Sequence, residues 1–338
     1  MTTKHDVDPT PSPDLQADLD RLQRARAALA TVVVGQSATI EQLLVTLVCG
    51  GHALIEGAPG LGKTLLVRTL ADVCGLTFSR IQFTPDLMPA DVTGSTALVY
   101  DDDGRASTRF VPGPIFGQLV LADEINRATP KTQSSLLEAM QEQTVTVGGR
   151  MHTMPSPFHV LATQNPFEME GTYTLPEAQI DRFFYKVVVD YPSEDVLDAI
   201  LDQTTGNTGA RAQRALDASD LLRMQRLVRD VPVASHVRRA VARFVRATLP
   251  DVDGNDPRVR RYVRFGVSPR GGQALLLAAK AHALLDGRFA VAFDDLRAAV
   301  LPALRHRIQL NFEGHADDIL ADGLLLELFE RYAASVRA

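Results

Sequence analysis

Apolar residues follow two different rhythms along this chain, and the change from one to the other falls near Pro192. Before that point, short apolar runs of strand length alternate with stretches in which apolar residues recur at helical spacing. Strands that alternate with helices form parallel sheets covered on both faces, so this part predicts an α/β fold. The expected strands are 52–56, 78–83, 118–122, 159–163 and 185–190. The expected helices are 15–29, 40–49, 65–73 and one that begins at Thr129-Pro130.

Helical periodicity continues from Pro192 to the end of the sequence with few strand signals, which predicts a small bundle of helices. At the other end, residues 1–13 are rich in proline and polar residues and are expected to form a disordered tail. A chain of 338 residues is long enough for two domains. The pattern therefore divides it into the tail, an α/β core over 14–205 and an all-helical domain over 206–338.

Two segments interrupt the alternation within the core, and both predict β-hairpins. Residues 93–112 alternate around Asp101-Asp102-Asp103-Gly104, which is a turn signal. Residues 144–150 alternate and reach Gly148-Gly149 shortly before the expected strand 159–163. Three consecutive aspartates could bind a metal ion, but their spacing misses the Ca²⁺-loop pattern, so a solvated turn is the favoured interpretation.

The composition is that of an ordinary globular protein, with 45% hydrophobic and 22% charged residues. No apolar run approaches the length of a membrane span, and the first residues do not form a secretory signal, so no membrane insertion is expected. Cys49 and Cys74 lie in apolar surroundings and are expected to be buried free thiols, which fits a cytoplasmic location. The net charge of −6 gives no general attraction to nucleic acid.

A phosphate-binding loop follows the first expected strand. Its residues are Gly57, Ala58, Pro59, Gly60, Leu61, Gly62, Lys63 and Thr64, and they meet every fixed position of the pattern G-x-x-x-x-G-K-[ST]. The glycines let backbone N–H groups turn towards the phosphates, and Lys63 adds a positive charge. Thr64 offers a hydroxyl to Mg²⁺. The helix expected from Leu65 to Val73 places the loop at a helix N-terminus, where anions bind well.

A pair of carboxylates indicates that the bound nucleotide is hydrolysed. Asp123 and Glu124 end the apolar run Leu119-Val120-Leu121-Ala122. Asp123 is placed to hold Mg²⁺, directly or through water, and Glu124 is placed to orient and polarise the attacking water. A surface Asp-Glu pair at the end of a strand is the plainer alternative, and the phosphate-binding loop upstream argues against it.

Three motifs together resemble the MoxR family of AAA+ ATPases: Asp123-Glu124-Ile125-Asn126-Arg127-Ala128, Gly57-Ala58-Pro59-Gly60 and Ala162-Thr163-Gln164-Asn165-Pro166. The resemblance extends over roughly residues 15 to 335, and the two hairpins match those that mark one branch of AAA+ proteins. It implies a P-loop NTPase core of αβα layers around a parallel sheet, followed by a C-terminal all-helical lid domain. The implied cofactors are ATP and Mg²⁺, with Thr64 and Asp123 as the residues that hold the metal.

The resemblance also implies roles for residues outside these motifs. Asn165 matches the sensor 1 position, where a neutral side chain bonds the attacking water or the γ-phosphate. Arg182 matches the arginine finger, which reaches the γ-phosphate of a neighbouring subunit. Arg270 matches sensor 2 in the first turn of a lid helix, where a basic residue opposes the macrodipole and is better explained by an anionic ligand. Gly35 and Gln36 match the segment near the adenine. The nucleotide contacts expected in this way are Gly35, Gln36, residues 57–64, Leu65 and Asp123.

The function implied by the family is ATP hydrolysis by a ring, usually of six subunits, with chaperone-like remodelling or activation of a partner protein. MoxR relatives are typically associated with proteins that carry a von Willebrand factor A domain. A nucleic-acid motor is an alternative, but the second hairpin carries only Arg150 and no aromatic residue near its tip, so nucleic acid is not the favoured partner. A basic run could serve a nucleic acid or be a solvated helix face: Arg258, Arg260, Arg261 and Arg264. A metal-chelatase motor subunit is a further alternative, and a simple nucleotide switch a weaker one.

Overall fold

The computed structural model describes residues 13–100, 105–166, 171–205, 212–252 and 256–332. The expected tail, apart from Pro13, and the expected turn at 101–104 lie outside the described residues. The predicted division of the chain after residue 205 falls at the start of another such gap, and it stays a prediction.

Five parallel strands form the central sheet in the order β2-β5-β8-β1-β9. The strands are β1 (Ala53–Gly57), β2 (Phe78–Gln82), β5 (Leu119–Asp123), β8 (His159–Gln164) and β9 (Tyr185–Val189). Each matches an expected strand within one residue at either end. Ala53 of β1 pairs with Leu161 of β8 on one side and with Tyr185 of β9 on the other, so β1 is buried inside the sheet. The predicted α/β fold with a parallel sheet is confirmed.

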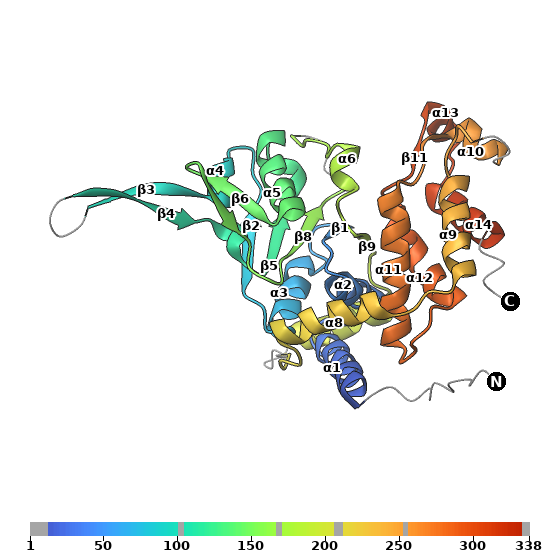
Figure 1. The fold of residues 1–338 in the computed structure, drawn as a ribbon, viewed down its shortest axis with the longest axis horizontal. Coiled ribbons are helices and arrows are strands. Elements are labelled where there is room, and N and C mark those ends of the chain that lie inside the picture. Colours follow the sequence, from blue (N-terminus) through green and yellow to red (C-terminus); the bar gives the residue numbers. More distant parts are fainter. Residues whose placement is uncertain (1–12, 101–104, 167–170, 206–211, 253–255, 333–338) are drawn as a thin grey trace, which may run out of the picture.

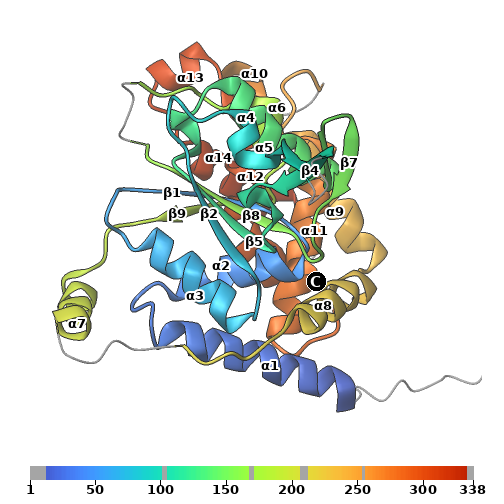
Figure 2. The same cartoon turned by 90° about the vertical axis from the view of Figure 1, so that its left-hand side faces the viewer.

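Helices cover both faces of this sheet (Figure 2). Ala53 and Ile55 of β1 pack with helices on one face, whereas Leu54 belongs to a second apolar cluster on the other face. The helices before and within the core are α1 (Pro13–Ala30), α2 (Ser37–Val48), α3 (Lys63–Val73), α4 (Pro89–Thr93), α5 (Pro130–Glu142), α6 (Glu177–Ile180) and α7 (Glu194–Thr205), with short 3₁₀ turns η1 (Pro114–Phe116) and η2 (Ile125–Arg127). Burial on both faces explains why the strands are continuous apolar runs.

Most helices of the C-terminal part of the chain form a bundle beside the sheet, on the right in Figure 1, whereas the first of them lies below the core near α1. The helices of this part are α8 (Ala218–Asp230), α9 (Ser235–Ala247), α10 (Pro257–Tyr262), α11 (Pro269–Leu285), α12 (Phe293–Leu304), α13 (Phe312–Ala316) and α14 (Ala321–Tyr332). A short antiparallel pair that the sequence did not predict joins β10 (Val263–Phe265) to β11 (Gln309–Leu310). Helix α8 lies against α1, where Arg223 forms an ion pair with Asp18 at 2.6 Å.

Both predicted hairpins are present. The first comprises β3 (Gly94–Tyr100) and β4 (Ala106–Pro112), and it projects far from the body of the molecule (Figure 1). The second comprises β6 (Thr144–Val147) and β7 (Arg150–Thr153). Phe110 of β4 stacks on His152 of β7 with ring centroids 3.8 Å apart, so the two insertions touch each other near the base of the first.

Cys49 and Cys74 are free and buried, as expected, and burial raises the pKa of the Cys74 thiol to about 12. Across the described ranges, the helices are too short or too polar to span a bilayer.

Candidate active site

The phosphate-binding loop lines a cavity of about 340 Å³ at the carboxyl edge of the sheet. Residues 59–64 form one wall, and Asp123, Glu124 and Asn165 form the other. The cavity lies between the ends of β1 and β8, where the strand order reverses, which is the position at which open α/β sheets bind ligands. The structure therefore brings together most of the residues that the sequence singled out.

The loop has the backbone that phosphate binding requires. Gly60 and Gly62 have φ values of +83° and +74°, which other residues adopt only with strain, and a Cβ on either would project into open space. Helix α3 begins directly after them, so its first N–H groups point towards the cavity. The Lys63 ammonium donates to the carbonyl oxygens of Gly57 at 2.6 Å and Ala58 at 2.8 Å, which holds the charge on the loop. These groups fit a phosphate.

Asp123 is buried at the end of β5, and both of its carboxylate oxygens accept hydrogen bonds. Thr163 Oγ1 donates to Oδ1 at 2.6 Å, and the Arg80 guanidinium donates to Oδ2 at 2.7 Å. Carboxylate and hydroxyl oxygens are the ligands that Mg²⁺ prefers, so Asp123 and Thr64 fit a magnesium site. A metal there would share the Asp123 carboxylate with Arg80, a residue that the sequence did not indicate.

Glu124 is held in place by neighbours on three sides. Its backbone lies in the left-handed region with φ of +57°, and its N–H donates to Thr163 Oγ1 at 2.8 Å. Gln82, at the end of β2, donates to Glu124 Oε2 at 2.8 Å, and Arg127 forms an ion pair with the same oxygen at 3.3 Å. The sequence did not indicate Gln82 or Thr163, because their roles depend on which strands flank β5.

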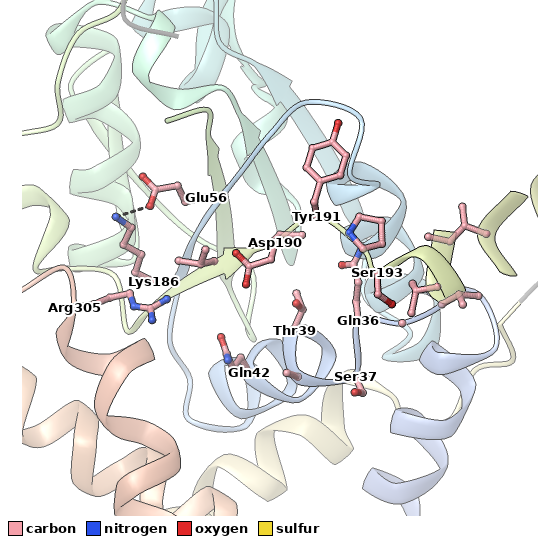
Figure 3. A pocket seen from close by; sticks show the side chains of 18 of the residues that line it. Gln36, Ser37, Thr39, Gln42, Glu56, Lys186, Asp190, Tyr191, Ser193 and Arg305 are labelled. Carbon is pink, nitrogen blue, oxygen red and sulfur yellow. Dashed lines mark ion pairs between the residues drawn. The ribbon is translucent and has the colours of Figure 1, made fainter. Parts of the chain in front are cut away.

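A second and larger cavity of about 740 Å³ is lined by Gly35 and Gln36 (Figure 3). Gln36 Nε2 donates to the Leu61 carbonyl at 3.1 Å, which ties this segment to the phosphate-binding loop. An ion pair between Glu56 and Lys186 at 2.6 Å forms part of the wall (Figure 3). The cavity therefore adjoins the loop and has room for a nucleoside. Leu65, by contrast, lines neither this cavity nor the one at the carboxyl edge, and half of its side chain is exposed.

Arg182 and Arg270 lie elsewhere. They line a cavity of about 310 Å³ together with residues 49–52, which precede β1, whereas the phosphate-binding loop follows β1. The two arginines are therefore at the amino edge of the sheet, and the loop of the same chain is at the carboxyl edge. Five residues of strand separate the two ends, which corresponds to about 16 Å.

The predicted start of α11 is confirmed around Arg270. Ser268 is the N-cap and accepts from the Gly271 N–H at 3.4 Å, and Pro269 is the first helical residue. Arg270 is exposed, and its side chain makes no hydrogen bond or ion pair within the described ranges. Its position in the first turn leaves the cation facing outwards.

Much of the basic run before α11 has partners within the chain. Arg258 pairs with Asp256 at 3.2 Å and with Glu327 at 2.7 Å. Arg261 pairs with Glu313 at 2.6 Å, and the Arg264 guanidinium lies 5.0 Å from the centre of its neighbouring phenylalanine ring. These contacts favour a solvated helix face over a surface that binds phosphates of a nucleic acid.

Comparisons with known proteins agree with this geometry. A profile described as "ATPase family associated with various cellular activities (AAA)" matches residues 52–185, and one described as "AAA lid domain" matches residues 255–323. The chain is 44% identical to "Chaperone MoxR1" of Mycobacterium tuberculosis over 93% of this chain and 82% of that relative. It is 36% identical to "Protein MoxR" of Paracoccus denitrificans over 86% of this chain and 89% of that relative. A crystal structure from Cytophaga hutchinsonii, provisionally described as an ATPase, superposes with a TM-score of 0.86 at 35% identity, covering 94% of this chain and 95% of its own.

Replacement of Gln82 tests whether its contact orients Glu124. We expect Gln82→Ala to lower the turnover of ATP about tenfold or more, because a free carboxylate is less often aimed at the attacking water. ATP binding, measured by calorimetry, should change little. Gln16→Ala is the matched control, since Gln16 donates to Asp20 on the exposed face of α1 at 2.9 Å. Equal turnover by Gln82→Ala and the wild type would refute the orienting contact.

Proposed function

Because the chain belongs to the MoxR family of AAA+ ATPases, we propose that it hydrolyses ATP with Mg²⁺ in a ring of identical subunits and thereby remodels a partner protein. The observation that carries the proposal is the separation of two sets of groups across the sheet. The phosphate-binding loop, Asp123 and Glu124 lie at the carboxyl edge, whereas Arg182 and Arg270 lie at the amino edge. A ring joins the two edges, because the amino edge of one subunit then faces the nucleotide of the next.

Each residue at the carboxyl edge has a task in hydrolysis. The backbone N–H groups of the loop and Lys63 bind the β- and γ-phosphates. Thr64 and Asp123 would hold Mg²⁺, and the ion would supply positive charge that stabilises the phosphates during hydrolysis. Glu124 orients the attacking water and accepts its proton, and Asn165, buried beside it, bonds that water or the γ-phosphate. The nucleoside occupies the larger cavity beside Gly35 and Gln36.

The neighbouring subunit completes the site. Arg182 lies folded on α5, where its Nη1 donates to the Leu137 carbonyl at 2.7 Å. Its Nε is buried and has no partner within the described residues, so the guanidinium is incompletely satisfied in this position. A γ-phosphate from the next subunit offers stronger, charge-assisted hydrogen bonds than a backbone carbonyl does. We therefore propose that Arg182 leaves α5 to neutralise charge in the transition state of its neighbour, with Arg270 beside it.

The hairpins are the parts we propose to contact the partner protein. Leu98, Tyr100 and Val111 expose apolar surface on the first hairpin, and Met151 does so on the second. Motion of the helical domain against the core during hydrolysis would displace both hairpins together, since they touch through Phe110 and His152. We propose six subunits, a cytoplasmic location and a partner with a von Willebrand factor A domain. The relative in Mycobacterium tuberculosis that is described as a chaperone supports a protein partner.

Replacement of Arg182 tests the shared site. We expect Arg182→Ala to lower turnover about 10³-fold while ATP binding changes little, because the arginine contributes to the transition state of another subunit. In the wild type, turnover per chain should rise with chain concentration until assembly is complete. Arg297→Ala is the control, since Arg297 pairs with Glu330 on the exposed side of the helical domain. Loss of ATP binding by Arg182→Ala, or turnover independent of chain concentration, would contradict a shared site.

Capture with a hydrolysis-deficient variant tests the partner. Glu124→Gln should keep ATP bound, so the assembled ring should retain a protein with a von Willebrand factor A domain when added to lysate. A second substitution in the Glu124→Gln chain tests the specificity of this capture. Lys63→Ala should abolish recovery of the partner protein, and Tyr100→Ser should lower that recovery several-fold. Phe312→Ser, which changes an exposed aromatic residue far from the hairpins, is the control. Recovery of nuclease-sensitive material in place of such a protein would overturn the proposed partner.

A further inference from the structure

A buried arginine of the helical domain, Arg307, donates hydrogen bonds to the segment that carries Arg182. Arg307 follows α12, and its exposed fraction is 8%. Its Nε donates to the Asp181 carboxylate at 2.8 Å, and its Nη2 donates to the carbonyls of Asp181 at 3.0 Å and Phe183 at 2.7 Å. Its Nη1 donates to the carbonyls of Phe184 at 3.2 Å and of Ala303. One guanidinium therefore bonds the backbone on both sides of Arg182.

Burial of a charged guanidinium is unfavourable by itself, because the group loses its hydrogen bonds with water. Burial lowers the pKa of Arg307, and the hydrogen bond that Arg307 donates to the Asp181 carboxylate opposes that shift. The guanidinium recovers the cost only when all its donors are used, and here every nitrogen has an acceptor. Planar geometry then fixes the direction of the segment 181–184, because a fork of rigid donors has one orientation that reaches these oxygens.

The Asp181 carboxylate also reaches a second element of the helical domain. Ser268 Oγ donates to it at 3.0 Å, and the same hydroxyl caps α11, whose first turn carries Arg270. Asp181 thus connects Ser268, at the start of α11, to Arg307. Asp181 directly precedes Arg182 in the chain, so both contacts are made next to that arginine. Neither Asp181 nor Arg307 lines the cavity that holds the phosphate-binding loop of its own chain.

We propose that Asp181 and Arg307 are positioning residues that join Arg182 and Arg270 of one subunit into a single unit, so that both cations enter the neighbouring site together. The proposal rests on the shared site proposed above. It predicts that loss of the Asp181–Arg307 contact impairs the site of the neighbour and spares the site of the chain in which it occurs. A contact that served only folding would impair both.

Mixing two inactive variants separates these effects. The acceptor chain carries Arg182→Ala, so it has an intact nucleotide site but supplies no arginine. The donor chain carries Glu124→Gln, so it supplies the arginine but cannot hydrolyse ATP. Neither should turn over ATP alone, and a mixture should recover activity at acceptor sites that face a donor. The measurement is the steady-state turnover and KM for ATP of the mixture, with co-assembly checked by affinity capture of a tag on the donor.

Asp181→Asn is then added to one chain at a time. This change removes the negative charge that Arg307 faces, and it leaves one acceptor oxygen in place of two for Arg307 Nε and Ser268 Oγ to share. In the donor, we expect the recovered turnover to fall about tenfold or more with KM little changed, because displacement of a charged group by about 1 Å has effects of this size. In the acceptor, the same change should leave the recovered turnover within about twofold. Glu330→Gln in the donor is the matched control, since it removes a carboxylate from the exposed pair with Arg297.

Arg307→Lys in the donor is a second, independent variant, because a lysine keeps the charge but has three donors on one nitrogen in place of a fork. It should give the same one-sided loss, and it carries the test if the Asp181→Asn chain fails to fold. Failure of the unmodified donor and acceptor to recover activity, although they assemble, would overturn the shared site itself. Three other results would overturn the positioning role but not the shared site. They are turnover undiminished by both donor variants, an equal loss of turnover from donor and acceptor substitutions, and loss of co-assembly.

Discussion

The direction of the parallel sheet is the constraint on which the rest of this structure depends. Because all five strands run the same way, the loop after β1 and the carboxylates after β5 meet at one edge, whereas residues directly before a strand lie at the other edge. Arg182 precedes β9 and therefore lies at the opposite edge. We propose that hydrolysis needs these groups together, and that association of subunits brings together the two sets that the sheet separates.

The helical domain contributes residues both near the phosphate-binding loop and near Arg182. It contributes Arg305 to the wall of the large cavity near the phosphate-binding loop, and it contributes Arg307 to the contact with Asp181. These two arginines are neighbours on one short segment after α12. The segment therefore lies between the large cavity of its own chain and the residues that hold Arg182. In the ring that we propose, this segment would be a short physical connection between adjacent sites.

The sequence predicted the five strands well, because a buried apolar run is a local pattern. The fixed spacing of residues 57–64 predicted a glycine-rich loop between a strand and a helix, and the structure has that loop beside a cavity. Gln82 and Thr163 escaped prediction because their contacts with Glu124 and Asp123 arise only when β2 and β8 flank β5. The β10–β11 pair escaped because two or three residues carry too little periodicity. The sequence likewise could not tell which edge of the sheet Arg270 would face, since packing between distant segments decides that.

A structure of the Glu124→Gln protein with ATP and Mg²⁺, at a resolution that shows side chains, tests the shared site most directly. The account predicts a closed ring in which Arg182 and Arg270 of each subunit lie about 3 Å from the γ-phosphate held by the loop of the next. A structure in which Arg182 remains on the Leu137 carbonyl, while Arg270 reaches the phosphate bound by its own chain, would contradict it.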